Sequence, residues 1–391
     1  MNQGEKLLED LREMVPSLRA RGQAAEEAGR ISEETVEELK RIDAFKAVVP
    51  KAYGGMEVDF PIIPQIFRIL GQGCTSTAWC MGFLIYHNYQ FGHYNKKAQD
   101  EAFGGRGYTM AAGQVMPSGE AKRVEGGFIL NGRWGYATGI QHCDYMGLSS
   151  PVSSGDEDEE PVLYRFYVPV EDFKILDTWQ VSAMKATGSH DVTLTDVFVP
   201  EHRSTTVESM RERTSPGMAI NTGPLWQIPL LTYMVFGAVG PMVGAAEALF
   251  EMVSDILKTK VGAYSGDQQQ GLMSQRIRLA RLKMELEATT GLFEKKAEEV
   301  WALVQRGETM GRDQRSEMRM VISHIAKKSH EIVDELAHAA GSRGTFLDSP
   351  IQRFHRDANA LATHAIYEYD HVGNIYGGTL LGVEPPANAM I

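Results

Sequence analysis

Cysteine is scarce in this sequence: Cys74, Cys80 and Cys143 are the only three among 391 residues. An odd number without the spacing of a metal motif excludes a disulfide framework and a cysteine-bound metal, and it is typical of reduced thiols in the cytosol. No stretch approaches the roughly 20 apolar residues of a membrane-spanning helix. The N-terminal segment is acidic and amphipathic, without the basic start of a secretory signal. We therefore expect a cytoplasmic protein that does not span a membrane.

Basic charge is also in short supply. The chain has 39 Lys and Arg against 51 Asp and Glu, which gives a net charge of −12. A nucleic-acid-binding surface needs clustered basic residues, so the composition argues against a nucleic-acid partner. The length of 391 residues predicts two or three domains, because it exceeds what one small core can organise.

Hydrophobic periodicity divides the chain into three parts. Residues 1–107 show the three- and four-residue spacing of amphipathic helices, and residues 108–218 show short β-rich runs between turn residues. Residues 219–391 are helical again and contain four long segments, which is typical of a bundle. The predicted fold class is therefore α+β, with an N-terminal helical domain, a central β domain and a C-terminal helical bundle.

Several helix boundaries follow from local signals. Ser32, followed by acidic residues, predicts a helix start. Gly377 and Gly378 predict the end of the last helix. The expected helices include 61–72, 76–90, 269–306, 312–340 and 350–376.

Four segments, in order along the chain, resemble the acyl-CoA dehydrogenase superfamily. They are FKAVVPKAYGG (45–55), GGFILNGRWGYATGIQHCDY (126–145), WQVSAMKATGSHDVTLTDVFVPEHR (179–203) and QRFHRDANALATHAIYEYDHVGNIYG (352–377). The resemblance covers nearly the whole chain. It implies a β-barrel-like central domain, a C-terminal four-helix bundle and a homotetramer, for which the Gly- and Ala-rich stretch 237–249 is one candidate for close packing.

Three further features resemble one branch of that superfamily, the two-component flavin-dependent monooxygenases. They are TSTAWCMGFLIYHNYQ (75–90) with its His87, Thr138 after the central strand, and His364 in the last segment. This branch includes 4-hydroxyphenylacetate hydroxylases and dibenzothiophene monooxygenases. The resemblance implies a reduced flavin, FMN or FAD, delivered by a separate NAD(P)H-flavin reductase. It also implies O₂ as co-substrate, a C4a-hydroperoxyflavin, and hydroxylation of an aromatic, phenolic substrate.

The resemblance assigns catalytic roles to His364, Thr138 and His87. A hydroxyl and an imidazole beside the flavin, Thr138 and His364, can shield and hydrogen-bond the reacting oxygen. His87 is expected to face the substrate, where an imidazole suits the removal of a phenolic proton near neutral pH. No metal is expected.

Further site residues follow from the same resemblance. The candidate flavin-binding residues are Trp134, Tyr136, Ala137, Thr138, Gly139, Trp179, Ser189, Arg278, Arg343 and Gly344. Of these, Arg343 and Gly344 are expected near the flavin phosphate, contributed by a neighbouring subunit, and Arg278 is a second candidate partner of the phosphate. The candidate substrate-binding residues are His87, Ser118, Tyr89 and Met110. Phe83 is an aromatic pocket candidate beside them.

Other readings of the residues stay open. Oxidation at nitrogen or sulfur would leave nearly the same signature as hydroxylation at carbon. An acyl-CoA dehydrogenase would need a carboxylate base, for which Glu368 is the candidate. Two Glu-x-x-His pairs, Glu335/His338 and Glu368/His371, would suit a di-iron oxygenase. A binding module without activity is the remaining alternative. We interpret Arg356-Asp357 as a structural ion pair or cap rather than as catalytic.

Overall fold

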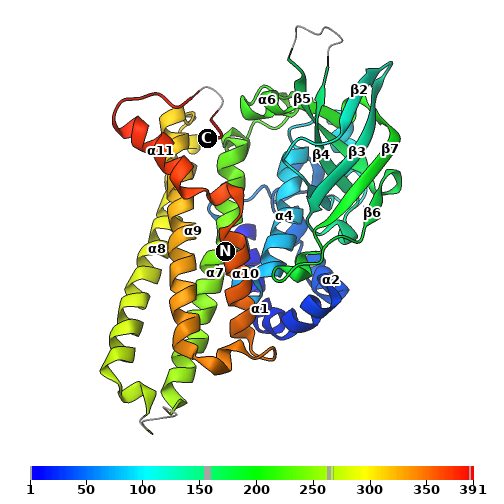
Figure 1. The fold of residues 1–391 in the computed structure, drawn as a ribbon. Helices are drawn as coiled ribbons and strands as arrows, with labels where there is room; N and C mark the ends of the chain where they lie inside the picture. Colours follow the sequence, from blue (N-terminus) through cyan, green and yellow to red (C-terminus); the bar gives the residue numbers. More distant parts are fainter. Residues whose placement is uncertain (1, 154–159, 262–265, 267, 387–388) are drawn as a thin grey trace.

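The computed structural model describes residues 2–153, 160–261, 266, 268–386 and 389–391. The chain forms a helical N-terminal part, a β domain and a long helical bundle, in that order (Figure 1). The β domain lies to one side of the bundle, and α4 (Thr75–Phe91) runs between them. The predicted α+β class is confirmed.

The N-terminal helices begin and end where local chemistry predicts. The first begins at Asn2, whose side chain accepts from the Glu5 N–H while the Glu5 carboxylate accepts in return, and ends at left-handed Gly29. Ser32 caps the second helix, as predicted, by accepting from the Thr35 N–H. The helices of this part are α1 (Gln3–Ala28), α2 (Glu33–Arg41), α3 (Ile62–Gly73), α4 (Thr75–Phe91) and α5 (Lys96–Phe103).

The β domain is one sheet of eight strands. The strand order is β6-β7-β3-β2-β4-β5-β8, and the short β1 pairs in parallel with β4. The strands are β1 (Ala111–Gly113), β2 (Glu120–Val124), β3 (Gly127–Ala137), β4 (Tyr145–Val152), β5 (Val162–Pro169), β6 (Lys174–Leu176), β7 (His190–Pro200) and β8 (Ser204–Thr206). The short α6 (Val207–Arg211) leads back towards the bundle. Inward-facing side chains of β3 and β5 pack with α4 in one hydrophobic core.

The C-terminal bundle differs from expectation at two places. The last helix does not end at Gly377 and Gly378, as predicted, but continues through them to Leu380, since neither glycine adopts a left-handed conformation. The segment predicted as a single helix over 350–376 is broken at 363–368. Thr363 Oγ1 donates to the Ala360 carbonyl and His364 Nδ1 accepts from the Ile366 N–H, so both side chains compete with helical backbone bonds. The helices are α7 (Leu230–Thr259), α8 (Met273–Gln305), α9 (Arg312–Ala340), α10 (Pro350–Ala362) and α11 (Tyr369–Leu380).

Glycines let α7 lie directly against α3. A Cβ added at Gly244 would lie 2.1 Å from the Arg68 carbonyl oxygen, and one at Gly71 would lie 2.9 Å from Pro241 Cα. An ion pair between Arg68 and Glu247, with an N–O distance of 2.6 Å, closes the same contact. The Gly-rich stretch of α7 is therefore used inside the subunit. The prediction that the stretch 237–249 packs between subunits is therefore wrong.

Helix α7 is also long and apolar enough to cross a membrane by length and composition alone, contrary to our reading of the sequence. Its most apolar 18-residue window is 83% buried inside the protein. Burial of this kind is typical of a core helix, so the apolar character of α7 is explained by its packing.

Candidate active site

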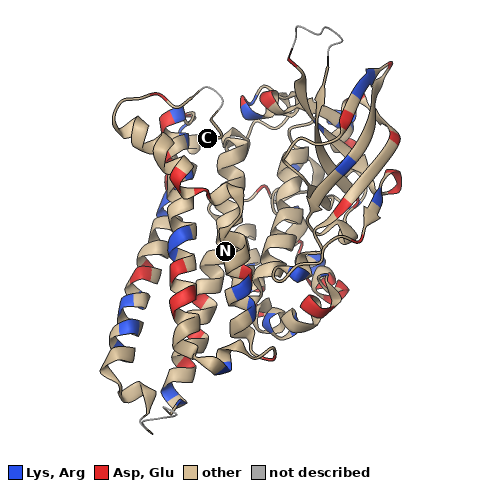
Figure 2. Ribbon diagram, in the orientation of Figure 1, with Lys and Arg blue, Asp and Glu red and all other residues tan. Residues whose placement is uncertain are grey.

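Helix α4 brings the functional segments together. It contains no Lys, Arg, Asp or Glu, and Figure 2 shows it uncoloured between the more highly charged surfaces of the bundle and the sheet. A helix that is apolar on all sides is typical of a buried position. Its Trp79 contacts the α10–α11 connection, and its Cys80 and His87 contact the β domain, as the next paragraphs describe.

His364 lies in the break between α10 and α11, with its ring centroid 5.3 Å from that of Trp79. Its Nδ1 accepts from the Ile366 N–H at 3.1 Å. The neutral ring therefore carries its hydrogen on Nε2, which has no hydrogen-bond partner in the part of the chain that the structure describes. Desolvation by the surrounding protein lowers the pKa of His364. The imidazole is thus a neutral N–H donor at neutral pH.

A cavity of about 520 Å³ adjoins His364, between the α10–α11 connection and α9. Glu368, the candidate dehydrogenase base, lines it too. The break in the helix means that His364 and Glu368 are not one helical turn apart, as the continuous helix would have required. The cavity residues are Ala326, Lys327, His330, Ala362, Thr363, His364, Ala365, Tyr367, Glu368 and Tyr369.

Thr138 follows β3 in a tight turn on α4. Its Oγ1 lies 3.0 Å from Ser189 Oγ, at the start of β7. Gly139 has φ +69°, and a Cβ there would lie 2.6 Å from Cys80 Sγ, so only glycine allows this approach. Cys80 is adjacent to Trp79 in α4. The turn therefore brings two hydroxyls to the helix that also contacts His364.

An aromatic pair borders this turn, with Tyr136 exposed and Trp179 half-buried. Tyr136 is 72% exposed and has φ +57°, and its ring centroid lies 5.8 Å from that of Trp179 in an edge-to-face arrangement. An exposed aromatic with a strained backbone is typical of a functional surface. Two hydroxyls beside one exposed ring and one half-buried ring suit a planar heterocycle with polar edges. The residues present therefore fit an isoalloxazine ring.

Two of the predicted flavin neighbours on β3 face the core instead. Trp134 is fully buried, and its Nε1 donates to the Ser149 carbonyl at 3.2 Å. Its ring lies where side chains at Gly119 and Gly132 would otherwise be. An irregularity of the β3–β7 register between Trp134 and Ala137 interrupts the alternation, so that both point inward while Tyr136 between them is exposed. Ala137 is also fully buried, which leaves only its backbone to reach a ligand.

The predicted phosphate-binding residues lie elsewhere in the subunit. Arg343 and Gly344 follow α9, and Arg278 is near the start of α8, at the end of the bundle remote from the β domain (Figure 1). Arg343 pairs with Asp348 at 3.7 Å, and Gly344 packs on Ile351. A single subunit does not bring these residues to Thr138, so their assignment stays a prediction that requires a second subunit.

His87 marks the other end of α4. Its Nδ1 lies 2.6 Å from the Ala111 carbonyl, so Nδ1 carries the hydrogen and Nε2 is the acceptor. Burial and the nearby Arg165 guanidinium lower the pKa of His87 to about 3. His87 is therefore neutral at physiological pH. It suits a hydrogen-bond acceptor for a phenolic hydroxyl better than the base acting near neutral pH that we expected.

Aromatic rings connect the two histidines along one face of α4. The ring centroids of Trp79 and Phe83 are 4.7 Å apart, and those of Phe83 and His87 are 6.0 Å apart. These positions are four residues apart, so they lie on the same helical face. Sequence reasoning named Phe83 as a pocket candidate and missed Trp79, whose contact with His364 depends on the unforeseen break after α10.

The other predicted substrate residues have different surroundings. Tyr89 stacks at 3.9 Å on Tyr233 and donates to the Ile228 carbonyl at 2.8 Å, so it belongs to the core and the prediction was wrong. Met110 is 2% exposed, with its backbone N–H bound to Asp144. Ser118 is half-buried and tied to β4 through its backbone, which leaves its hydroxyl as a candidate only.

Arg356 and Asp357 support the site without forming an ion pair with each other in the described structure. Arg356 Nη2 lies 2.6 Å from Glu26 Oε1 in α1. Asp357 is buried and accepts from Ser76 Oγ at 2.8 Å and from the Met184 N–H at 2.6 Å. The two residues hold α10 to α1, to α4 and to the loop before β7, a structural role as expected, although not as a mutual pair.

Burial gives Asp357 a testable pH dependence. It raises the pKa of Asp357 from 3.8 to about 6. The folded protein thus binds this proton more tightly than the unfolded chain. The resulting stability is fully present below the ordinary pKa and is lost as the pH rises through about 6. We expect Asp357→Asn to remove this loss, which amounts to about 3 kcal/mol.

Urea unfolding of both proteins at about pH 4 and about pH 7 measures the effect, because all other titrating groups are common to the two. A difference between the free energies of unfolding that stays constant with pH would show that Asp357 is ionised in the fold throughout.

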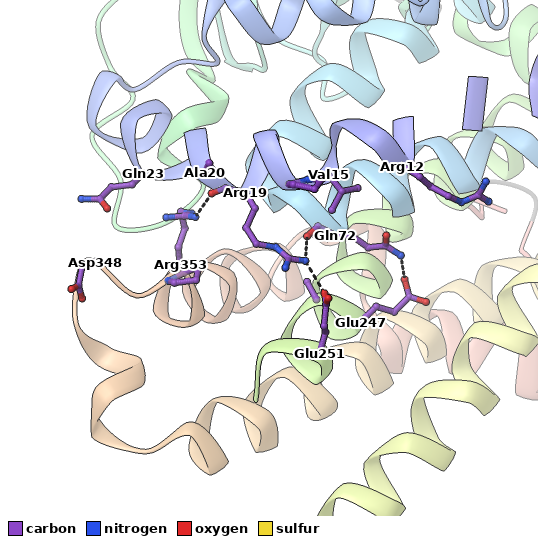
Figure 3. A pocket seen from close by; sticks show the side chains of 13 residues that line it. Arg12, Val15, Arg19, Ala20, Gln23, Gln72, Glu247, Glu251, Asp348 and Arg353 are labelled. Atoms are coloured by element: carbon purple, nitrogen blue, oxygen red, sulfur yellow. Dashed lines mark hydrogen bonds and ion pairs between the residues drawn. The ribbon is translucent and has the colours of Figure 1, made fainter. Parts of the chain in front are cut away.

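A separate cavity of about 840 Å³ lies between α1, α7 and α10 (Figure 3). Basic and acidic side chains alternate around it, and Arg19 donates there to the Gln72 carbonyl at 3.2 Å and to Glu251 at 3.1 Å. None of the predicted catalytic residues lines it. Arg19 and Glu251 form an ion pair in its wall, and this cavity is distinct from the site on α4.

The ligand set of a di-iron centre is not assembled. Glu335 pairs with Arg281, and no group of three or more His, Cys, Asp or Glu side chains among the described residues is arranged to hold a metal ion. The two Glu-x-x-His pairs are spacings in the sequence without a shared site in that part of the chain.

Comparisons with known proteins agree with the geometry. The family "Acyl-CoA dehydrogenase, C-terminal domain" matches residues 236–369. The p-hydroxyphenylacetate 3-hydroxylase oxygenase component of Acinetobacter baumannii is 29% identical over 98% of this chain and 90% of its own length. The HsaA monooxygenase of M. tuberculosis superposes with a TM-score of 0.90 at 26% identity, covering 98% of this chain and 99% of that one.

A third similar protein was solved with a flavin. XiaF from Streptomyces sp., in complex with FADH2 and glycerol, superposes with a TM-score of 0.90 at 26% identity, covering 99% of this chain and 98% of that one. Fold, site and relatives therefore agree. The chain belongs to the acyl-CoA dehydrogenase superfamily, within its branch of two-component flavin-dependent monooxygenases.

Proposed function

We propose that this protein hydroxylates a phenolic aromatic substrate, using O₂ and a reduced flavin supplied by a separate NAD(P)H-flavin reductase. The observation that carries the proposal is the aromatic face of α4, with His364 at one end and His87 at the other. The relatives named above include an oxygenase component that acts on p-hydroxyphenylacetate. Either reduced FMN or reduced FAD suits the surface around Thr138.

Each residue of the site has a definable task. Bound reduced flavin supplies the electrons that activate O₂. His364 holds a proton on Nε2 towards the reacting atoms, and the hydroxyls of Thr138 and Ser189 fix the polar edge of the ring. The indole of Trp79 and the ring of Phe83 exclude water between the two ends. Neutral His87 accepts a hydrogen bond from the substrate hydroxyl and so orients it.

The proposal extends to the assembly and its location. A homotetramer would allow Arg343 and Gly344 of a neighbouring subunit to reach the flavin phosphate, which a single subunit does not permit. The low cysteine content, with Cys74, Cys80 and Cys143 all free thiols, supports a cytoplasmic enzyme.

The decisive experiment supplies the purified protein with chemically reduced flavin, isotopically labelled O₂ and a panel of phenols. We expect one labelled oxygen atom in a hydroxylated ring. Labelled oxygen only on the nitrogen or sulfur of amine or thioether substrates would replace hydroxylation with the corresponding heteroatom oxygenation. Anaerobic oxidation of an acyl-CoA thioester, lost in Glu368→Gln, would overturn oxygenase chemistry altogether.

A further inference from the structure

Arg165 is a buried cation in the middle of β5. It is 4% exposed, and its side chain points across β4 and β1. Gly113 and Gly147, which are paired in the β1–β4 ladder, leave room for it. A Cβ at Gly113 would lie 2.5 Å from Arg165 Nη2, and one at Gly147 would lie 2.6 Å from the same atom. The paired glycines form a slot that the guanidinium occupies.

No carboxylate neutralises this charge within the described residues. Arg165 donates hydrogen bonds to the Gln114 carbonyl, Ser149 Oγ and Gln90 Oε1, and its guanidinium also interacts with the Tyr167 hydroxyl. Its Nε has no partner, and neither has the nearby Gln114 Oε1. The titratable side chains around it are Tyr86, His87, Tyr94 and Tyr167.

A buried charge without a counter-ion is costly, and an apolar side chain of similar volume would fill the slot at lower cost. The arrangement therefore needs a reason other than stability. The four titratable neighbours are neutral at physiological pH, because burial raises the pKa of each tyrosine and lowers that of His87. The missing negative charge must come from outside the subunit's own side chains.

The position of the guanidinium connects it to the substrate end of the site. The Cβ position at Gly113 lies 2.5 Å from Arg165 Nη2 and 2.6 Å from His87 Nε2. A cationic donor and a neutral acceptor therefore approach the same point. An oxygen atom beside that point can accept from Arg165 and, if it keeps its proton, donate to His87.

We propose that Arg165 anchors an ionised oxygen of the aromatic substrate and is thereby a specificity-determining residue. The inference rests on the proposed function, because it takes the His87 end of α4 as the place where substrate binds. The anionic oxygen belongs either to a carboxylate on the ring, which leaves the phenolic hydroxyl to donate to His87, or to a phenolate, whose proton is lost to solvent and which then pairs with Arg165 in place of donating to His87. Uncharged aromatic molecules of the same shape leave the guanidinium unpaired and bind weakly.

Two probes distinguish these sources without any turnover. 4-Nitrophenol absorbs visible light only when ionised, so its absorbance reports the charge of the bound phenol. Benzoate offers a carboxylate, and its binding is measured by calorimetry. For the wild type we expect a bound nitrophenol pKa at least about one unit below that in solution, or tight benzoate binding. Arg165→Met should abolish the pKa shift and weaken the bound anion by about 30-fold.

Control variants separate a binding role from a structural one. Arg165→Lys keeps the charge and should keep most of the nitrophenol shift, while Arg123→Met removes an exposed arginine of the same sheet and should change nothing. The melting temperature of Arg165→Met should not fall, because the substitution conserves volume and removes a buried charge. A lower melting temperature with unchanged anion binding would make Arg165 structural and overturn the proposal.

Failure of the anchor and failure of the proposed function give different results. If neither probe binds the wild type, or both bind Arg165→Met equally well, the anchor is refuted while hydroxylation of phenols can still be observed. If the nitrophenol shift is present and lost in Arg165→Met, yet no phenol gains oxygen, the anchor stands and the proposed reaction falls.

Discussion

Replacing His364 with alanine should reduce the hydroxylated product formed per reduced flavin about 100-fold, with hydrogen peroxide released in its place. The substitution removes a neutral N–H donor whose tautomer is fixed by the bond from the Ile366 N–H to Nδ1. It also removes the ring that packs against Trp79, so water reaches the flavin side of the site. Product and peroxide are quantified together in single-turnover reactions.

A second histidine provides a matched control. His355 lies in α10, and its side chain, 39% exposed, pairs with Asp334 at 2.8 Å. His355→Ala changes the same residue type without touching the aromatic face of α4, so product and peroxide yields should match the wild type. If His364→Ala and the wild type form the same amount of hydroxylated product per reduced flavin, His364 takes no part in the reaction.

Replacing Gly244 with alanine should lower the free energy of unfolding by about 2 kcal/mol, although alanine is the better helix former. Its Cβ would lie 2.1 Å from the Arg68 carbonyl oxygen and 2.8 Å from the Gln72 nitrogen. Backbone atoms cannot rotate away, so α3 and α7 must separate. Strain of up to about 3 kcal/mol exceeds the gain of about 1 kcal/mol in helix propensity.

Gly291 supplies the opposite case. It is exposed within α8, and a Cβ there would meet nothing within 4 Å. Gly291→Ala should therefore raise the free energy of unfolding by about 1 kcal/mol. Urea titration of the two variants beside the wild type gives both values. Stabilisation by both substitutions would show that α3 and α7 can move apart without loss.

The order of helical and β-rich parts was predictable because periodicity reports which face of each segment is buried. The helix predicted over 312–340 has the same bounds as α9. The helix predicted over 76–90 differs from α4 by one residue at each end. The break after α10 was not predictable from periodicity. It depends on the side chains of Thr363 and His364 bonding to nearby backbone, which no apolar spacing reveals.

Site residues that belong to a sequence motif could be predicted, whereas those whose position depends on tertiary packing could not. Thr138 and His87 lie beside α4 and within it, as the resemblance implied. Tyr89, two residues after His87, points instead into a stack of core rings. In the sequence, Arg165 is only one basic residue in an apolar strand. Its buried position could not be predicted, because it depends on two glycines that are distant in sequence and adjacent in the sheet.

The direct contact of α3 with α7 has a consequence for how the chain folds. These helices are separated in sequence by the entire β domain, which leaves the helical body after α5 and returns to it at α7. The three parts that periodicity separates are therefore not three independent folding units. The β domain is an insertion into one helical body, and that body closes only after a long loop has been brought together, a requirement that slows folding. A fragment that ends before α7 lacks the surface that covers α3, so the N-terminal helices depend for their burial on a part of the chain that is synthesised after the β domain.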